Sequence, residues 1–216
     1  MEKNHLIWAL VDNRTGNKNQ ILGILNELKI PHKIFSIEYN YFANFPNFFI
    51  QLFGGMLHLK SKRFNPPYPS IIISCGRRTF PVSQRLKSFI KSSPYIFHLM
   101  YPKYSMNVNS CNIIFTPTHD NILDKQNIFK TIGSPSIKKK QKEKVDFYFK
   151  KPLVSILIGG DHGRFTLKKE NIELLVNETL KKLGNGSIFI TTSRRTSMKV
   201  VKKLNLLKKK NKKIKK

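Results

Sequence analysis

Acidic residues are scarce in this chain of 216 residues: 12 Asp and Glu stand against 40 Lys and Arg, which gives a formal net charge of +28. This imbalance implies an anionic partner, which is nucleic acid, a membrane surface or a phosphorylated small molecule. Lys, Asn and Ile are all abundant, as in proteins encoded by AT-rich genomes, so part of the charge is compositional and forms a solvated face. The arginines are fewer, and their clustering is therefore more informative.

Cysteines and long apolar runs are also few. The two cysteines, Cys75 and Cys111, lack the spacing of a metal site, and we expect reduced thiols in a cytoplasmic protein. Only six apolar residues, 6–11, follow the polar N-terminus, which is too short for a signal peptide. No run of about 18 apolar residues exists, so the sequence predicts no membrane-spanning helix.

The most informative stretch is I-I-I-S-C-G-R-R-T-F-P-V, residues 71–82. Its β-branched run predicts a buried strand, and Arg77 and Arg78 follow the end of that strand. Thr79 is a natural N-cap for the helix that we expect next. A helix N-terminus favours anions because its free N–H groups and its dipole point outward, so two guanidinium groups stand at an anion-binding position.

The same pattern returns at residues 187–196, S-I-F-I-T-T-S-R-R-T. A second predicted strand leads to Arg194 and Arg195, and Thr196 precedes another apolar helical pattern. The repetition predicts two similar α/β units, each with a loop able to hold a phosphate.

Strand and helix patterns alternate along the chain, which predicts βαβ units with parallel strands. We expect strands at 6–11, 34–37, 71–74, 96–99 and 112–115, and in a separate sheet at 153–158 and 187–191. Ligands of such sheets bind beyond the carboxyl ends of the strands, where the loop 12–20 lies. This loop does not fit G-x-G-x-x-G, so the dinucleotide fingerprint is absent.

Two further loops follow predicted strands at the same edge. His119 and Asp120 come after the strand at 112–115, and a His beside a carboxylate can act as a base. Adjacent residues rarely form that pair themselves, so a purely structural loop is the alternative. Gly159 and Gly160 follow the strand at 153–158, in a glycine-rich loop where backbone can approach a phosphate closely.

The stretch from Tyr39 to Leu59 is rich in aromatic residues and almost without charge, and Lys60, Lys62 and Arg63 follow it directly. One interpretation is a core helix or a packed insertion. The other is a monotopic membrane contact, with aromatic rings in the interface and basic residues on anionic headgroups.

These patterns divide the chain into an N-terminal Rossmann-like domain at 1–135 and a basic linker at 136–151. A partial second Rossmann-like domain follows at 152–198, and we expect a disordered lysine-rich tail at 199–216. The second unit has only two predicted strands, whereas a doubly wound domain normally needs four or more. The predicted fold class is therefore α/β, with two Rossmann-like units of which the second is incomplete.

A family resemblance rests on six ordered motifs over residues 6–198: W-A-L-V-D-N-R-T-G-N-K-N-Q, I-S-C-G-R-R-T, T-P-T-H-D, T-I-G-S-P, I-L-I-G-G and T-T-S-R-R-T. In this order they resemble the plant mitochondrial-fission (elongated-mitochondria) protein family and its bacterial relatives. That family is similar in fold to GT-B glycosyltransferases, in which two Rossmann-like domains hold a nucleotide sugar mainly through the C-terminal one.

The resemblance implies roles for particular residues. The donor side, which would bind the nucleotide and its phosphates, would include Gly159, Gly160, Ser193, Arg194, Arg195 and Thr196. The acceptor side would include Gly16, Asn17, Gln20, Arg77, Arg78 and Thr79. Asp12, His119 and Asp120 would lie on the acceptor side too, as candidate catalytic groups. Family members continue well past Thr196, so we expect a truncated or frameshifted second unit, which would bear on donor binding and catalysis.

The leading functional hypothesis is a metal-independent glycosyltransferase of GT-B type that takes a nucleotide-diphosphate sugar and needs no cofactor. The alternative is a non-catalytic scaffold of the same fold, attached peripherally to an anionic membrane such as the inner membrane. A nucleic-acid binder driven by charge ranks last, because the sequence holds no recognisable RNA- or DNA-binding motif.

Overall fold

The computed structural model describes residues 6–61, 63–137, 148–161 and 165–215. The chain divides into two units, residues 1–140 and 141–216. Most of the predicted linker, residues 138–147, lies outside the described residues. None of the helices in the described ranges is long and apolar enough to cross a bilayer.

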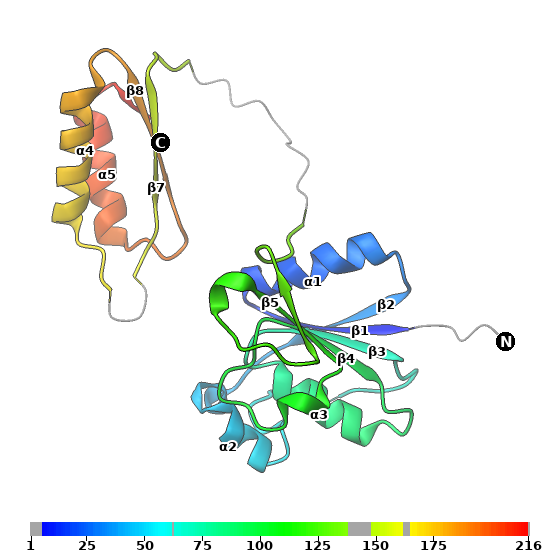
Figure 1. The fold of residues 1–216 in the computed structure, drawn as a ribbon. Coiled ribbons are helices and arrows are strands. Elements are labelled where there is room, and N and C mark those ends of the chain that lie inside the picture. Colours follow the sequence, from blue (N-terminus) through cyan, green and yellow to red (C-terminus); the bar gives the residue numbers. More distant parts are fainter. Residues whose placement is uncertain (1–5, 62, 138–147, 162–164, 216) are drawn as a thin grey trace. The chain divides into compact units, whose positions relative to one another are not determined.

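The first unit is built on a six-stranded parallel sheet with the strand order β2-β1-β3-β4-β5-β6 (Figure 1). Its strands are β1 (Ile7–Asp12), β2 (His32–Ile37), β3 (Ile71–Cys75), β4 (Tyr95–Leu99), β5 (Ile113–Pro117) and β6 (Ile128–Thr131). The five strands predicted for this unit are confirmed, with ends that differ by one or two residues. β6 was not among them. The parallel pairing places the carboxyl ends of all six strands at one edge.

Helices cover both faces of this sheet (Figure 1). Side chains alternate along a strand, so β1 sends Ile7 and Ala9 to one face and Trp8 to the other. The first face packs on α1 (Thr15–Leu28), and the second packs on α3 (Phe80–Phe89). Both faces of β1 are therefore buried, as its continuous apolar run requires.

A segment between β2 and β3 forms two short helices, η1 (Tyr41–Asn44) and α2 (Asn47–Leu52). An isolated antiparallel bridge between Tyr39 and Leu59 closes the segment at its base. Two further 3-10 turns, η2 (Val108–Ser110) and η3 (Thr118–Asp120), flank β5. The sequence allowed two interpretations of this stretch, a core helix or packed insertion and a membrane contact. The structure shows a compact insertion in the crossover from β2 to β3.

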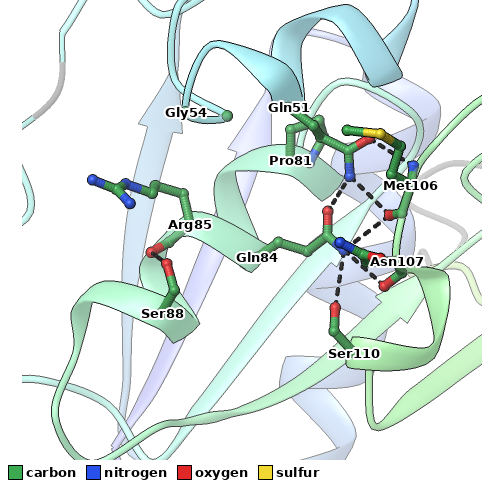
Figure 2. A pocket seen from close by; sticks show the side chains of 10 residues that line it. Gln51, Gly54, Pro81, Gln84, Arg85, Ser88, Met106, Asn107 and Ser110 are labelled. Carbon is green, nitrogen blue, oxygen red and sulfur yellow. Dashed lines mark hydrogen bonds between the residues drawn. The ribbon is translucent and has the colours of Figure 1, made fainter.

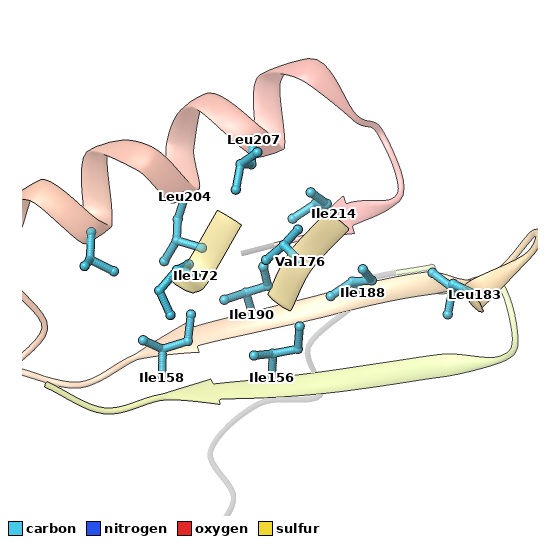
Figure 3. Close-up of a cluster of buried hydrophobic side chains, with 11 residues drawn as sticks. Ile156, Ile158, Ile172, Val176, Leu183, Ile188, Ile190, Leu204, Leu207 and Ile214 are labelled. Atoms are coloured by element: carbon cyan, nitrogen blue, oxygen red, sulfur yellow. The ribbon is translucent and has the colours of Figure 1, made fainter. Parts of the chain in front are cut away.

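The second unit is a three-stranded parallel sheet with the order β7-β8-β9, made of β7 (Leu153–Ile158), β8 (Ser187–Thr192) and β9 (Ile214–Lys215). Both strands predicted here are confirmed. Two helices, α4 (Lys169–Leu183) and α5 (Met198–Lys210), supply the rest of its core. Figure 3 shows side chains of both helices meeting Ile156, Ile158, Ile188 and Ile190 of the sheet.

The prediction of a disordered tail at 199–216 is wrong. Val200, Leu204 and Leu207 lie on one side of α5 and are buried in the core of the unit, while the lysines face outward. Ile214 is also buried, and it pairs with Ile188 to add β9 to the sheet. The high lysine content hid this pattern, although lysine is itself a good helix former.

Two free cysteines are buried in the first unit, and burial raises the pKa of both Cys75 and Cys111 to about 12. His98 on β4 is fully buried as well: its Nδ1 lies 2.7 Å from Ser74 Oγ, and Phe80 meets the ring edge-on. Burial lowers the pKa of His98 from 6.5 to about 3, so this imidazole is neutral in the folded protein.

We expect His98 to make the first unit sensitive to acid. Below pH 6.5 the unfolded chain protonates this histidine, whereas the folded chain stays neutral down to about pH 3. The stability that His98 supports is complete above pH 6.5 and falls by about 1.4 kcal/mol per pH unit as the pH decreases. Chemical denaturation between pH 7.5 and 4 measures this slope, and His98→Gln should have a shallower one. Equal slopes would contradict the assignment.

Candidate functional site

Asp12 ends β1 at the carboxyl edge of the first sheet, and its side chain is only 4% exposed. Its Oδ1 accepts from the backbone N–H of Arg14 and its Oδ2 accepts from Asn17 Nδ2, both at 3.1 Å. Burial raises the pKa of Asp12, while these two hydrogen bonds and the charges of Arg14 and Arg78 oppose that rise. The carboxylate therefore fixes the turn into α1.

Asn17 and Gln20, which the sequence placed at this edge, lie in the first turns of α1 and are half-buried. A side chain at Gly76 would come within 2.7 Å of Asn17 Nδ2, and Gly76 has a φ of +80°. A glycine is needed there so that the end of β3 can approach α1. Gly16, by contrast, has open space where a Cβ would stand.

Arg77 lies where the sequence predicted, directly after β3, but its guanidinium is occupied by the protein itself. It donates to Ala43 O at 2.9 Å, to Phe45 O and to Asn47 Oδ1 at 3.3 Å. Asn47 Nδ2 in return donates to Arg77 O at 2.7 Å. Arg77 thus fastens the insertion between β2 and β3 to the sheet, and no sequence pattern indicates these partners, which lie about thirty residues away.

Arg78 reaches the same insertion, and within the described residues part of its hydrogen-bonding capacity is unused. It donates to Asn44 Oδ1 at 3.1 Å, and its guanidinium lies 5.4 Å from the centre of the Tyr39 ring. The Tyr39 ring stacks on His58 at 5.4 Å, and His58 Nε2 donates to Arg78 O at 2.7 Å. These three residues form one contact cluster.

Each member of this cluster has a buried polar atom without a hydrogen-bond partner among the described residues: Arg78 Nε, Tyr39 Oη and His58 Nδ1. Burial lowers the pKa of His58, and the nearby charges of Arg77 and Arg78 add to this effect. The imidazole is therefore neutral, and because Nε2 donates, Nδ1 is an unpaired acceptor. Tyr39, His58 and Arg14 were missed from the sequence. The only signal was a polar residue at 58 inside an apolar stretch.

Positive charge accumulates around Asp12. Burial lowers the pKa of both Arg77 and Arg78; the charges of Arg78 and Arg14 also lower that of Arg77, and the charge of Arg14 also lowers that of Arg78. One buried carboxylate thus stands near the guanidinium groups of Arg14 and Arg78, and the charge of Arg77 lies close to these two. This surplus favours an anion at the edge of the first sheet.

The three candidate catalytic groups do not meet. His119 and Asp120 lie on η3 at the end of β5, which β3 and β4 separate from β1, so they are about 14 Å from Asp12 at ordinary strand spacing. Asp120 Oδ2 accepts from Thr116 Oγ1 at 3.1 Å, while the exposed His119 has no hydrogen-bond partner in the part of the chain that the structure describes. The sequence could not reveal this distance because it does not state the spatial order of the strands.

Thr79 stands at the N-cap position of α3, as predicted, but its side chain makes no capping hydrogen bond there. Its hydroxyl is fully buried and donates to Cys75 O at 2.8 Å and to Gly76 O at 3.1 Å. The cap at α5 differs too, because Ser197 accepts from the N–H of Val200 there, and Thr196 is turned inward. In both units the threonine after the arginine pair closes the strand-to-helix turn.

The two predicted phosphate loops of the second unit are neighbours, because Ile158 and Thr192 are paired at the ends of β7 and β8. Thr196 Oγ1 donates to Gly159 O at 2.6 Å and the N–H of Ser193 donates to Ile158 O at 3.0 Å. Gly160 lies so close to this turn that a Cβ there would stand 2.0 Å from Arg195 O. Gly159 has open space at the same position.

We call the two neighbouring loops, residues 159–160 and 193–196, the double loop. Its side chains differ in whether they contact other described residues. Ser193 Oγ accepts from the N–H of Arg195 at 3.1 Å, so it shapes the loop. Arg194 is exposed and has no hydrogen-bond or ion-pair partner within the described ranges. An exposed guanidinium near an open backbone turn is suited to binding a phosphate. Among the residues described, no three His, Cys, Asp or Glu side chains cluster as metal ligands would.

The sequence as a whole matches a known family. The family model described as mitochondrial fission ELM1 matches residues 15–215. This chain belongs to the mitochondrial fission ELM1 family. The resemblance noted in the sequence is thereby confirmed.

One relative of this ELM1-family chain is the uncharacterized protein RP120 of Rickettsia prowazekii (strain Madrid E). The two are 30% identical over 118 residues, which is 53% of this chain and 32% of that protein. The match thus spans about a third of the length of the curated relative.

Two solved structures of other proteins share the fold of this chain. The S. aureus MnaA–UDP co-structure has a TM-score of 0.57 at 11% identity, over 98% of this chain and 67% of that one. UDP-GlcNAc 2-epimerase from Methanocaldococcus jannaschii has a TM-score of 0.53 at 15% identity, over 97% of this chain and 72% of that one. These likenesses confirm the predicted α/β, GT-B-like fold.

The brace made by Arg77 should be measurable in this ELM1-family member. Arg77→Ala removes charged hydrogen bonds to three acceptors, and we expect a loss of about 3 kcal/mol in the free energy of unfolding of the first unit. Arg85→Ala is the matched control, because Arg85 is exposed and has no such partner in the described ranges. Denaturant titration compares the two. A loss at Arg77 no larger than at Arg85 would show that the brace is not stabilising.

The glycine pair of the second unit offers another matched comparison. Gly160→Ala would force a Cβ against the backbone of Arg195, so we expect the second unit to lose several kcal/mol, about 2–4, of stability. Gly159→Ala meets nothing and should stay within about 0.5 kcal/mol of the parent chain. Thermal unfolding followed by circular dichroism distinguishes them, and equal midpoints for both variants would refute the close approach.

Proposed function

We propose that this chain binds a nucleotide-diphosphate sugar at the double loop of the second unit and acts as a GT-B-like glycosyltransferase. The observation that carries the proposal is that the open Gly159 turn neighbours the loop of Arg194, whose exposed guanidinium has no partner among the described residues. Backbone N–H groups and a forked guanidinium are the donors that a diphosphate needs. The UDP in the S. aureus co-structure belongs to that protein, and it supports the choice of a uridine nucleotide as the first probe.

The chemistry would be the transfer of a sugar from a diphosphate to an acceptor hydroxyl. The bond between the anomeric carbon and the diphosphate oxygen breaks, the acceptor oxygen bonds to that carbon, and a base takes the hydroxyl proton. Arg194 would stabilise the negative charge that develops on the leaving diphosphate. This role requires no bound metal, since the cationic side chain supplies the charge.

The first unit would supply the acceptor side. The surplus of guanidinium groups around Asp12 suits an acceptor that carries an anionic group. His119 remains the proposed base because it is exposed at the sheet edge and has no hydrogen-bond partner among the residues described. Asp12 and Asp120 would position the surrounding turns, since their carboxylates are held by Asn17 and Thr116.

Calorimetric titration tests the donor site. Uridine, guanosine and adenosine diphosphates are titrated into the full chain, and we expect at least one to bind. Arg194→Ala should weaken that binding about ten- to a hundredfold, since a charge-assisted hydrogen bond contributes roughly 1.5–3 kcal/mol. Arg194→Lys should restore only part of it, because an ammonium cannot donate two parallel hydrogen bonds. Lys182→Ala, at the far end of α4, is the control and should bind like the parent.

Absence of binding by the unmutated chain at millimolar concentration would overturn the donor site. It would favour the alternative, a non-catalytic protein of the same fold that is attached peripherally to a membrane. Tighter binding of a short oligonucleotide than of any nucleotide would favour charge-driven binding of nucleic acid instead. A cytoplasmic location is part of the proposed function.

A further inference from the structure

The insertion between β2 and β3 presents large apolar side chains to solvent. We call residues 41–53 the aromatic segment. Phe48 is 52% exposed, Leu52 71% and Phe53 58%, and all three lie on or directly after α2. Rings contact one another along the segment: Phe45 stacks on Phe49 with centroids 5.0 Å apart, and Phe49 meets Phe53 at a tilt with centroids 4.8 Å apart. A contiguous exposed patch of this kind marks an interaction surface.

The opposite side of α2 is anchored, so the exposure of these rings is built into the fold. Figure 2 shows Gln51 of α2 turned toward Gln84 of α3 and toward Met106. Gln51 Nε2 donates to Gln84 Oε1 and to Met106 O, the latter at 2.9 Å, and Gln51 Oε1 accepts from the N–H of Met106 at 2.7 Å. These contacts line a cavity of about 380 Å³ between the two helices. Phe48 and Leu52 are four residues apart, so they share one side of α2, and both are exposed.

Two close approaches reinforce the anchor. A Cβ at Gly55 would stand 2.8 Å from Pro81 O, and Gly55 has a φ of +76°, so only glycine lets the chain leave α2 along α3. The N–H of Phe48 donates to Tyr104 O at 2.9 Å, which ties α2 to the loop that follows β4. The aromatic segment is therefore a rigid platform on the first unit.

The chain around this platform carries charge of one sign. No acidic residue occurs between Glu38 and Asp120, whereas nine Lys and Arg do. Arg85 lines the cavity beside Gly54 in Figure 2, and Lys103 precedes the loop that contacts α2; both are exposed. An exposed apolar segment with exposed cations on neighbouring elements complements a surface that is apolar inside and anionic outside.

We propose that the aromatic segment docks on the surface of an anionic lipid bilayer. Phe48, Leu52 and Phe53 enter the boundary between headgroups and acyl chains, which buries apolar area that is now exposed. Arg85 and Lys103 lie against the phosphate groups, where each basic residue adds electrostatic attraction. This inference does not depend on nucleotide binding, because it uses the first unit alone.

Sedimentation with vesicles tests the docking with the full chain. Vesicles of phosphatidylcholine alone are compared with vesicles that also contain phosphatidylglycerol, and we expect binding to the anionic ones only. A triple variant, Phe48→Ser, Leu52→Ser and Phe53→Ser, should weaken this binding at least tenfold. The matched control removes three exposed apolar side chains elsewhere on the same unit, as Leu123→Ser, Phe129→Ser and Ile132→Ser, and should change it less than twofold.

A fluorescent reporter distinguishes insertion from attraction of lysines alone. The single tryptophan of the chain, Trp8, is fully buried and gives a constant background. Phe53→Trp should show a blue-shifted emission with anionic vesicles that persists when salt is raised enough to screen charges. An unchanged emission, or equal losses in the two triple variants, would overturn the proposal in favour of charge alone.

Sedimentation velocity tests the other possible partner of the aromatic segment, a second copy of the chain. If the parent chain forms a dimer that the aromatic triple variant dissociates, the segment contacts a second copy and the proposal is wrong. A monomer in both cases supports a lipid surface. Diphosphate binding by the triple variant should equal that of the parent, so a failure of docking stays distinct from a failure of the donor site.

Discussion

The guanidinium of Arg77 is the constraint on which the edge of the first unit depends. It connects the end of β3 to two backbone carbonyls and one amide oxygen of the insertion between β2 and β3. The insertion buries few large side chains of its own, since only Ala43 and Ile50 of its two helices belong to the hydrophobic core. Its position is therefore set by polar contacts, and these contacts decide where Tyr39 and His58 meet Arg78.

The two arginine pairs show that the same local sequence can have different contacts in the two units. Both follow a parallel strand and both precede a threonine that donates to backbone carbonyls at the strand end. Arg77 is surrounded by acceptors from a neighbouring insertion, whereas Arg194 has no partner among the residues described. The same Arg-Arg-Thr motif thus supplies a structural brace in one unit and an exposed cation in the other, and the difference arises from the loops that surround it.

The sequence was most informative where a side-chain pattern has one physical solution. Continuous β-branched runs such as Ile71–Ile73 must be buried on both faces, and the strands they predicted are present. Helix α5 was missed because its three buried residues are outnumbered by lysines, although their spacing is helical. The site was harder to predict, because the partners of Arg77 come from distant residues and because strand order decides that Asp12 and His119 lie apart.

The burial of both thiols has a consequence for the chemistry of the first unit. Cys75 and Cys111 lie in two different hydrophobic clusters, on opposite faces of one sheet, and neither ionises at neutral pH while the unit is folded. An oxidant or an alkylating reagent can therefore react only during an opening of that face. The rate at which each cysteine is modified then reports how often its own side of the sheet opens. The two thiols therefore report separately on local unfolding of the two faces.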